Sequence, residues 1–163
     1  MNYAFSYSTC AGDVVIVEDG SSVTSIFFGN DIPPDAVYSE TPLLKKAFNQ
    51  VQEYLRGDRR EFSLPIKLEG TDFQKAVWDA LLSIPYGETK SYSEIASAVG
   101  NPRSQRAVGS ACSKNPILLV VPCHRVVSSS GATSGYAAGV ALKEKLLELE
   151  KRISQSFDSS HIV

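Results

Sequence analysis

The residue types best suited to covalent chemistry stand side by side at Cys123 and His124. A cysteine near a histidine can act as a nucleophile, because the imidazole can take the thiol proton and the thiolate is the reactive form. The pair follows Pro122 and an apolar run, 117–121, that predicts a buried strand. Neighbouring side chains in an extended segment point to opposite faces, so cooperation requires a sharp turn or a bridging water. A cysteine that packs as a small core hydrophobe is the competing interpretation.

A histidine that accepts a proton also needs a carboxylate on its other ring nitrogen, because that contact fixes the tautomer and stabilises the imidazolium. Three glutamates of the predicted last helix are candidates for this role: Glu144, Glu148 and Glu150. The pattern alone does not choose among them. Asn115, just before the apolar run, is expected on general grounds to hold a turn through its side chain.

Length and composition indicate a soluble globular protein. The 163 residues, 43% hydrophobic and 21% charged, suffice for one ordinary domain or two small ones. No apolar run approaches the ~20 residues of a membrane span, and no secretory signal is expected. Three cysteines without regular spacing are typical of reduced thiols, which favours a cytoplasmic location. With two histidines and no C-x-x-C pair, no structural zinc site is expected.

The first part of the chain predicts a small α/β scaffold. Residues 14–17 and 23–28 are β-branched and aromatic runs on either side of a turn, which is typical of an antiparallel hairpin. A helix is expected to follow, because Thr41 can cap its start and Gly57 can end it. Gly70 marks the expected boundary between this small antiparallel sheet with its helix and the rest of the chain.

The second part is predicted to be mostly helical. Residues 71–74 and 91–94 both have the capping-box pattern that opens a helix. A further helix is expected over 102–113 with Asn101 as its N-cap, and a last one over 139–152. The expected bounds are 1–69 for the α/β domain, 70–154 for the helical domain and 155–163 for a frayed tail.

Two of these short helices, joined by a tight turn at Gly100, make a helix-turn-helix candidate. Residues 85–127 hold five Lys or Arg against two Glu, which permits a face that binds a polyanion. A DNA-binding version would place the second helix in a groove with Arg106 near the bases. Two helices that merely pack together fit the same spacing.

Short segments over residues 71–150 resemble the O6-alkylguanine-DNA alkyltransferases, also called methylated-DNA–protein-cysteine methyltransferases. The matching segments are 85–89, 91–96, 106–109, 115–116, 122–127, 130–131, 135–136 and 146–150. They keep the family's order and spacing, and the Pro-Cys-His-Arg-Val core is highly specific. The resemblance implies a ribonuclease-H-like α/β domain followed by a mostly α, winged helix-turn-helix domain.

The resemblance implies that the alkyl group of an O6-alkylguanine passes directly and irreversibly to Cys123, so that each molecule reacts once. His124 would take the thiol proton through a water, and Glu150 would orient His124. Asn115 would tie the helix-turn-helix to the active-site strand, and Tyr92 would donate a proton or hydrogen bond to the leaving base. No cofactor and no metal are implied, and the protein is expected to act as a monomer.

The resemblance also implies that the target nucleotide leaves the DNA stack, with Arg106 filling the vacated space from the minor groove. The residues expected to contact DNA are Tyr92, Arg103, Arg106, Ala107, Gly109, Ser110, Ala111, Lys114 and Arg125. The expected pocket residues are Val126, Tyr136 and Ala137, and a loop from 130 to 138 is expected to form the pocket wall. Cys112 is expected only to pack.

Three other functions remain for comparison. A non-catalytic alkyltransferase-like module would bind damaged bases without repairing them, but such modules lack the acceptor cysteine. A Cys-His-Glu hydrolase would turn over many times. A winged-helix transcription factor would leave the Pro-Cys-His-Arg segment unexplained. O4-alkylthymine is a second candidate substrate.

Overall fold

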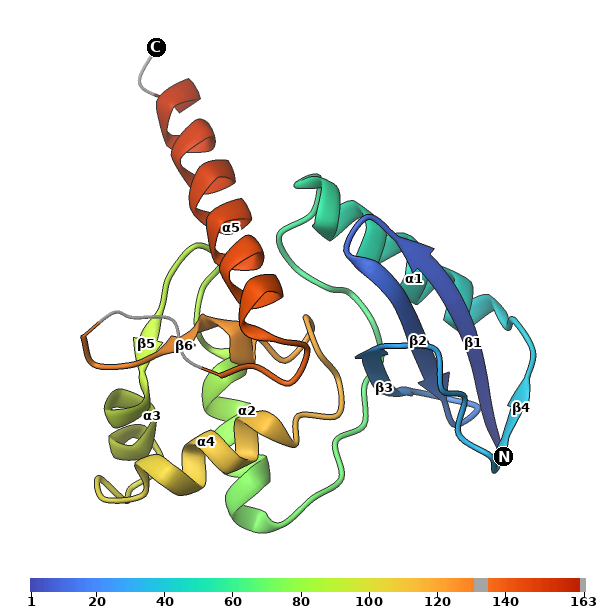
Figure 1. Ribbon diagram of the computed structural model, residues 1–163, viewed down its shortest axis with the longest axis horizontal. Coiled ribbons are helices and arrows are strands. Elements are labelled where there is room, and N and C mark those ends of the chain that lie inside the picture. Colours follow the sequence, from blue (N-terminus) through green and yellow to red (C-terminus); the bar gives the residue numbers. More distant parts are fainter. Residues whose placement is uncertain (131–134, 162–163) are drawn as a thin grey trace. The chain divides into compact units, whose positions relative to one another are not determined.

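The structure is a computed structural model that describes residues 1–130 and 135–161, with side chains through residue 155 of the last helix. The chain forms two compact units (Figure 1). Unit 1 contains Met1–Glu69 and Pro116–Val120, and unit 2 contains Gly70–Asn115 and Val121–Val163. No helix among the described residues is long and apolar enough to cross a membrane.

Unit 1 is built on a four-stranded sheet. Its strands are β1 (Asn2–Thr9), β2 (Gly12–Glu18), β3 (Val23–Phe28) and β4 (Ala36–Tyr38), in the order β3-β2-β1-β4. The pairs β1–β2 and β2–β3 are antiparallel, but β4 runs parallel to β1. The predicted antiparallel sheet is therefore mixed, because the loop after β3 returns the chain to the far edge in the direction of β1.

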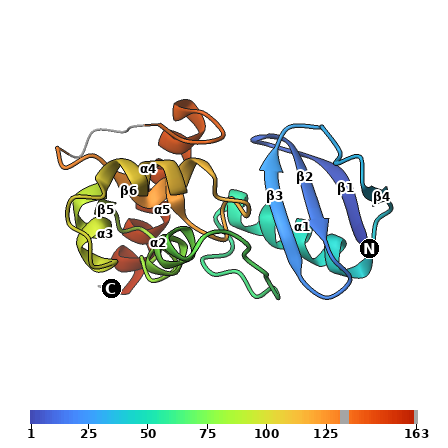
Figure 2. The same cartoon turned by 90° about the horizontal axis from the view of Figure 1, so that it is seen from below.

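Helix α1 (Pro42–Arg56) covers one face of this sheet (Figure 2). The Thr41 side chain accepts a hydrogen bond from the Leu44 N–H at 3.2 Å, and Gly57 ends the helix with φ +85°. This left-handed conformation favours glycine, which has no Cβ to clash. Both ends of the helix predicted from the sequence are confirmed.

The segment Pro116–Val120 differs from the strand expected at 117–121. The Ile26 N–H donates to the Pro116 carbonyl at 2.9 Å, and the Leu118 N–H donates to the Ile26 carbonyl at 3.0 Å. These bonds form only an isolated bridge to β3, after which Leu119 turns the chain with φ +74°. The segment is buried as predicted, but it belongs to unit 1 and not to the helical part that contains its neighbours.

Unit 2 contains four helices and a short parallel strand pair in the part of the chain described. The helices are α2 (Asp72–Leu82), α3 (Tyr92–Ala98), α4 (Gln105–Ser113) and α5 (Val140–His161), and the strands are β5 (Lys90–Ser91) and β6 (Val126–Val127). Both predicted capping boxes are present, at the starts of α2 and α3. Trp78 of α2 is buried and donates its Nε1–H to the Ala111 carbonyl of α4 at 3.0 Å. The helix-turn-helix prediction is confirmed in α3 and α4.

Two helix boundaries differ from the sequence prediction. Helix α4 begins at Gln105, because residues 101–104 form a turn in which the Ser104 N–H and hydroxyl both donate to the Asn101 carbonyl. Asn101 is therefore not its N-cap. Helix α5 continues to His161 where a frayed tail was expected. No proline or glycine occurs over residues 140–161, so the sequence contains no residue that would stop this helix.

Candidate active site

Cys123 lies on a single turn of 3-10 helix, η1 (Cys123–Arg125), two residues after the apolar run 117–121. Pro122 precedes the turn, and its carbonyl accepts a hydrogen bond from the Arg125 N–H at 2.9 Å. Cys123 is 3% exposed. The sharp backbone turn removes the geometric objection to a Cys-His pair, because neighbouring side chains no longer have to point to opposite faces.

Asn115 connects the end of α4 to the acceptor thiol. Its Nδ2 donates to the Val121 carbonyl at 2.8 Å and to the Cys123 Sγ at 3.2 Å. The side chain is buried, so both contacts are shielded from water. A hydrogen bond to sulfur favours the thiolate over the thiol.

His124 and Glu150 form a buried pair. His124 Nε2 lies 2.7 Å from Glu150 Oε2, and both side chains are almost fully inaccessible. Glu144 and Glu148 face solvent, so the structure selects Glu150 among the three candidates. Because His124 donates from Nε2 to the carboxylate, its Nδ1 is the nitrogen that can accept a proton.

Arg125 is buried beside the same carboxylate, which overturns its prediction as a DNA-binding residue. Its Nε donates to Glu150 Oε1 at 2.8 Å and its Nη2 to Oε2 at 3.0 Å. The remaining Nη1 donates to the Ile84 carbonyl at 2.7 Å, and the Gly87 N–H donates to Glu150 Oε1 at 3.1 Å. The guanidinium thus holds the turn after α2, the 3-10 helix and α5 together inside unit 2.

These contacts set the resting charges of the site. Burial raises the pKa of Glu150, but hydrogen bonds and charge from His124 and Arg125 outweigh it and hold that pKa at about 2. Burial lowers the pKa of His124 against the opposing effect of Glu150. Burial raises the pKa of Cys123 to about 11, against smaller lowering effects that include the Asn115 hydrogen bond. At neutral pH the site holds a thiol, a neutral imidazole and an ionised carboxylate.

A cavity of about 430 Å³ opens at the thiol, which is within the range of small-molecule sites. Its lining residues are Tyr92, Gly109, Cys112, Ser113, Cys123, Gly135, Tyr136 and Ala137. Tyr136 and Ala137 were expected there, but Val126 is not among the lining residues and lies in β6, paired with Lys90. The Tyr136 hydroxyl is buried without a hydrogen-bond partner among the described residues. Residues 131–134 of the expected loop lie outside those described.

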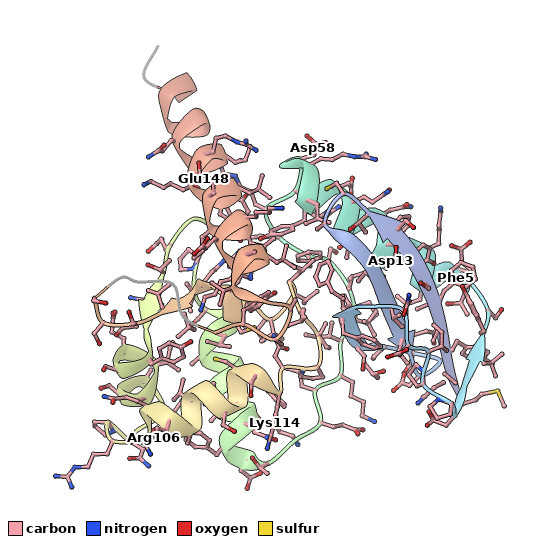
Figure 3. All side chains as sticks on the ribbon, in the orientation of Figure 1. Phe5, Asp13, Asp58, Arg106, Lys114 and Glu148 are labelled. Carbon is pink, nitrogen blue, oxygen red and sulfur yellow. The ribbon has the colours of Figure 1, made fainter. Side chains whose placement is uncertain are left out.

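The surface of α4 carries most of the residues expected to contact DNA. Arg106 extends away from the protein, while Lys114 caps the other end of the helix (Figure 3). Ala107 and Ser110 are also exposed, and Arg103 is exposed in the turn before α4. Ala111 corrects a prediction, because it is 1% exposed and faces α2 through its bond with Trp78. Gly109 faces the cavity, where an added Cβ would lie 3.8 Å from the Tyr92 ring.

Two buried side chains near the thiol were not predicted to belong to the site. Cys112, expected only to pack, lines the same cavity as Cys123. Lys143 of α5 is fully buried and donates from Nζ to the Gly135 carbonyl at 3.3 Å. The spacing in the sequence could have indicated the buried position of Lys143. It lies three residues before Leu146 and seven before Glu150, and so shares their helix face.

Two family models match this chain. The ribonuclease-like domain of 6-O-methylguanine DNA methyltransferase matches residues 2–68, and the DNA-binding domain of the same family matches residues 72–152. The constitutive methylated-DNA–protein-cysteine methyltransferase of Bacillus subtilis is 42% identical, over 93% of this chain and 96% of its own. The chain belongs to the 6-O-methylguanine DNA methyltransferase family.

Other methyltransferases of this family agree with the assignment. The methylated-DNA–protein-cysteine methyltransferase of Mycobacterium leprae is 43% identical, over 93% of each chain. A crystal structure of Mycobacterium tuberculosis OGT in complex with DNA is 40% identical, has a TM-score of 0.87, and covers 93% of this chain and 94% of its own. These relatives confirm the predicted fold class and the predicted enzyme class, a DNA-repair methyltransferase.

Proposed function

We propose that this protein repairs O6-alkylguanine in double-stranded DNA by moving the alkyl group to the sulfur of Cys123. The observation that carries the proposal is the thiol itself. It is fixed by Asn115, opens on a cavity of about 430 Å³, and lies in the same turn as a histidine hydrogen-bonded to Glu150. Family membership supplies the reaction class, and this geometry supports the roles that we propose for these residues.

The reaction forms one bond and breaks one. His124 takes the thiol proton at Nδ1 through a water, because its Nε2–H is held by Glu150. The thiolate attacks the alkyl carbon, so that an S–C bond forms while the C–O6 bond breaks. The electron pair stays with the guanine, whose anion accepts a hydrogen bond from the Tyr92 hydroxyl and takes up a proton from water, while the imidazolium returns the thiol proton to water. The thioether is stable in water, so each molecule reacts once.

The cavity receives a base that has left the duplex, because a thiol held inside unit 2 cannot reach O6 within the stack. The exposed side chain of Arg106 suits the role of filling the vacated space, since its planar guanidinium can take the place of a base. Arg103 and Lys114 are exposed near the ends of α4, where they can bind phosphates. Tyr136 can pack on the everted base and direct its hydroxyl to it.

The thiols also bear on where the protein works. Cys10, Cys112 and Cys123 are all free, and burial favours the protonated form of the acceptor. A reducing compartment keeps such an acceptor intact. A cytoplasmic location is therefore part of the proposal, as is the monomeric state expected from the sequence.

Counting transferred groups tests the reaction. The protein is mixed with excess duplex that contains O6-methylguanine, and the methyl groups moved to protein are counted against protein molecules by intact mass. We expect one methyl per molecule and no further turnover. Repeated turnover would indicate the hydrolase, and tight binding without a mass increase would indicate the damaged-base-binding module. A duplex with O4-methylthymine in the same assay measures the second candidate substrate.

Cysteine variants identify which residue accepts the methyl group. Cys123→Ala should bind the damaged duplex and gain no methyl group. Cys10→Ala is the matched control, because Cys10 is exposed in unit 1 and should leave transfer unchanged. Methyl transfer to the Cys123→Ala protein at the wild-type stoichiometry would overturn the proposal.

A further inference from the structure

Unit 2 buries the ammonium group of Lys143, which takes no part in the reaction steps proposed above. Lys143 of α5 has no exposed surface. Its Nζ donates to the Gly135 carbonyl at 3.3 Å and lies 5.8 Å from the centroid of the Tyr92 ring. Within the described ranges, no carboxylate forms an ion pair with it. A buried cation without a negative partner is costly, so its position calls for a compensating interaction.

Both contacts of Lys143 belong to the wall of the Cys123 cavity. Burial is the main influence on the two groups, and it raises the pKa of Cys123 to about 11 and lowers that of Lys143. Their mutual attraction acts the other way. The ammonium lowers the pKa of the thiol, and the thiolate raises the pKa of the amine. Each group therefore becomes charged more readily when the other is charged.

Proton transfer creates two new charges inside unit 2, a thiolate at Cys123 and an imidazolium at His124. When His124 accepts the thiol proton, the new imidazolium lies against Glu150, which also binds Arg125. The single negative charge of Glu150 is then shared between two cations. The thiolate remains in a buried site, where a nearby cation favours the charged form of the sulfur over the neutral thiol.

We propose that Lys143 supplies the positive charge that stabilises the Cys123 thiolate during alkyl transfer. The inference rests on the proposed function for its reaction, but Lys143 contacts two residues of the Cys123 cavity wall in the absence of DNA. Lys143 acts through the thiolate and forms no bond with the alkyl group. Its hydrogen bond to Gly135 and its position over Tyr92 hold the ammonium beside the cavity without neutralising it.

No other ionisable group around the thiol, among the residues that the structure describes, offers a free positive charge. Arg125 of η1 is occupied by Glu150. The other ionisable side chains that line the cavity are a thiol and two phenols, which cannot carry a positive charge. They are Cys112 of α4, Tyr92 of α3 and Tyr136 before α5. Burial raises the pKa of Cys112 to about 12, so it stays a neutral thiol during the reaction.

The test measures thiol ionisation without DNA. The rate at which iodoacetamide alkylates Cys123 is followed from pH 5 to pH 11, with peptide mass spectrometry to separate Cys123 from Cys10 and Cys112. Lys143→Met keeps the length of the side chain and removes its charge. We expect its rate profile to move to higher pH, and a thiol pKa higher by one would slow alkylation at neutral pH about tenfold. Lys143→Arg should stay within a few-fold of the wild type.

Lys145→Met is the matched control, because Lys145 is exposed on the same helix two residues away. Its profile should superimpose on that of the wild type. A Lys143→Met profile that also superimposes, in a protein that still unfolds cooperatively, would overturn the inference. If the wild-type protein transfers no methyl group from DNA, that result would count against the proposed function and not against the pairing of Lys143 with Cys123.

A second measurement needs no variant and remains decisive if Lys143→Met fails to fold. The pKa of Lys143 is measured by NMR of ¹³C-labelled lysine before and after Cys123 is blocked with iodoacetamide. Blocking removes the thiolate, so we expect the pKa of Lys143 to fall. An unchanged Lys143 titration would contradict the pairing.

Discussion

The carboxylate of Glu150 accepts hydrogen bonds from three residues of unit 2, namely His124, Arg125 and Gly87. These donors come from the 3-10 turn η1 and from the turn after α2, and those of η1 keep the carboxylate ionised although it is 1% exposed. An ionised Glu150 makes His124 a better proton acceptor at Nδ1, because the imidazolium that forms is stabilised. The residue therefore has both a structural and a catalytic effect, and the two can be separated by experiment.

Glu150→Gln should impair both methyl transfer and the stability of the fold. The amide carries no charge, so the single-turnover rate of methyl transfer should fall about tenfold to a hundredfold. Leaving Arg125 buried without its partner should cost about 3–5 kcal/mol in the free energy of unfolding, measured with urea. Glu148→Gln, exposed on the same helix, should change neither quantity. A Glu150→Gln protein with wild-type transfer would remove Glu150 from the mechanism.

The depressed pKa of Glu150 also predicts a pH dependence of stability. The pKa falls from 4.5 to about 2 on folding, so the stabilisation is fully present above pH 4.5 and is lost as the pH falls toward 2. This difference in pKa corresponds to ~3 kcal/mol. Urea unfolding of the wild type and Glu150→Gln from pH 6 to pH 2 should show the wild-type advantage shrinking across that window. An advantage that stays constant with pH would contradict the account.

At the scale of elements, local signals were reliable and long-range ones were not. The capping boxes of α2 and α3 and both ends of α1 were predictable, because each depends on residues within one turn. Asn101 followed by Pro102 resembles the start of a helix, but the chain first makes a turn whose bonds involve Ser104. The isolated bridge from Pro116–Val120 to β3 joins residues about 90 positions apart, which no local pattern encodes.

The site residues also differ in whether the local sequence reveals them. Cys123 and His124 are adjacent in the sequence, so their chemistry was readable from their types. The choice of Glu150 came only from the family resemblance, because three glutamates share the helix. Arg125 was placed on the DNA-binding surface and Lys143 was missed, because a charged residue normally indicates a solvated surface. The buried positions of both depend on contacts made in the folded unit.

The exposed position of Arg106 on helix α4 predicts how its removal affects repair. If this exposed side chain fills the stack that the damaged nucleotide leaves, its removal should matter only when the base is in a duplex. Arg106→Ala should slow transfer from duplex O6-methylguanine at least tenfold, and transfer from a free O6-alkylated guanine less than twofold. Ser97→Ala, an exposed site on α3, is the control. Equal losses on both substrates would count against the role of Arg106.

For the molecule as a whole, the net charge of −2 conceals where DNA can bind. Within the described part of α4 and its flanking turns, the exposed cations are Arg103, Arg106 and Lys114. Binding to undamaged duplex should weaken with salt, with a slope of log K against log salt of about −2 if Arg103 and Lys114 each contact one phosphate. Alanine at either of these two positions should reduce the slope by about one. A slope near zero in fluorescence anisotropy titrations would contradict this binding face.

Two thiols, Cys123 and Cys112, line the cavity, and the account assigns the reaction to only one of them. The most direct test is to react the protein with a duplex that carries O6-[¹³C]methylguanine, digest it, and locate the label by peptide mass spectrometry. The account predicts the ¹³C-methyl group on the sulfur of Cys123 and none on Cys112 or Cys10. Label on Cys112, or on any residue other than Cys123, would contradict it.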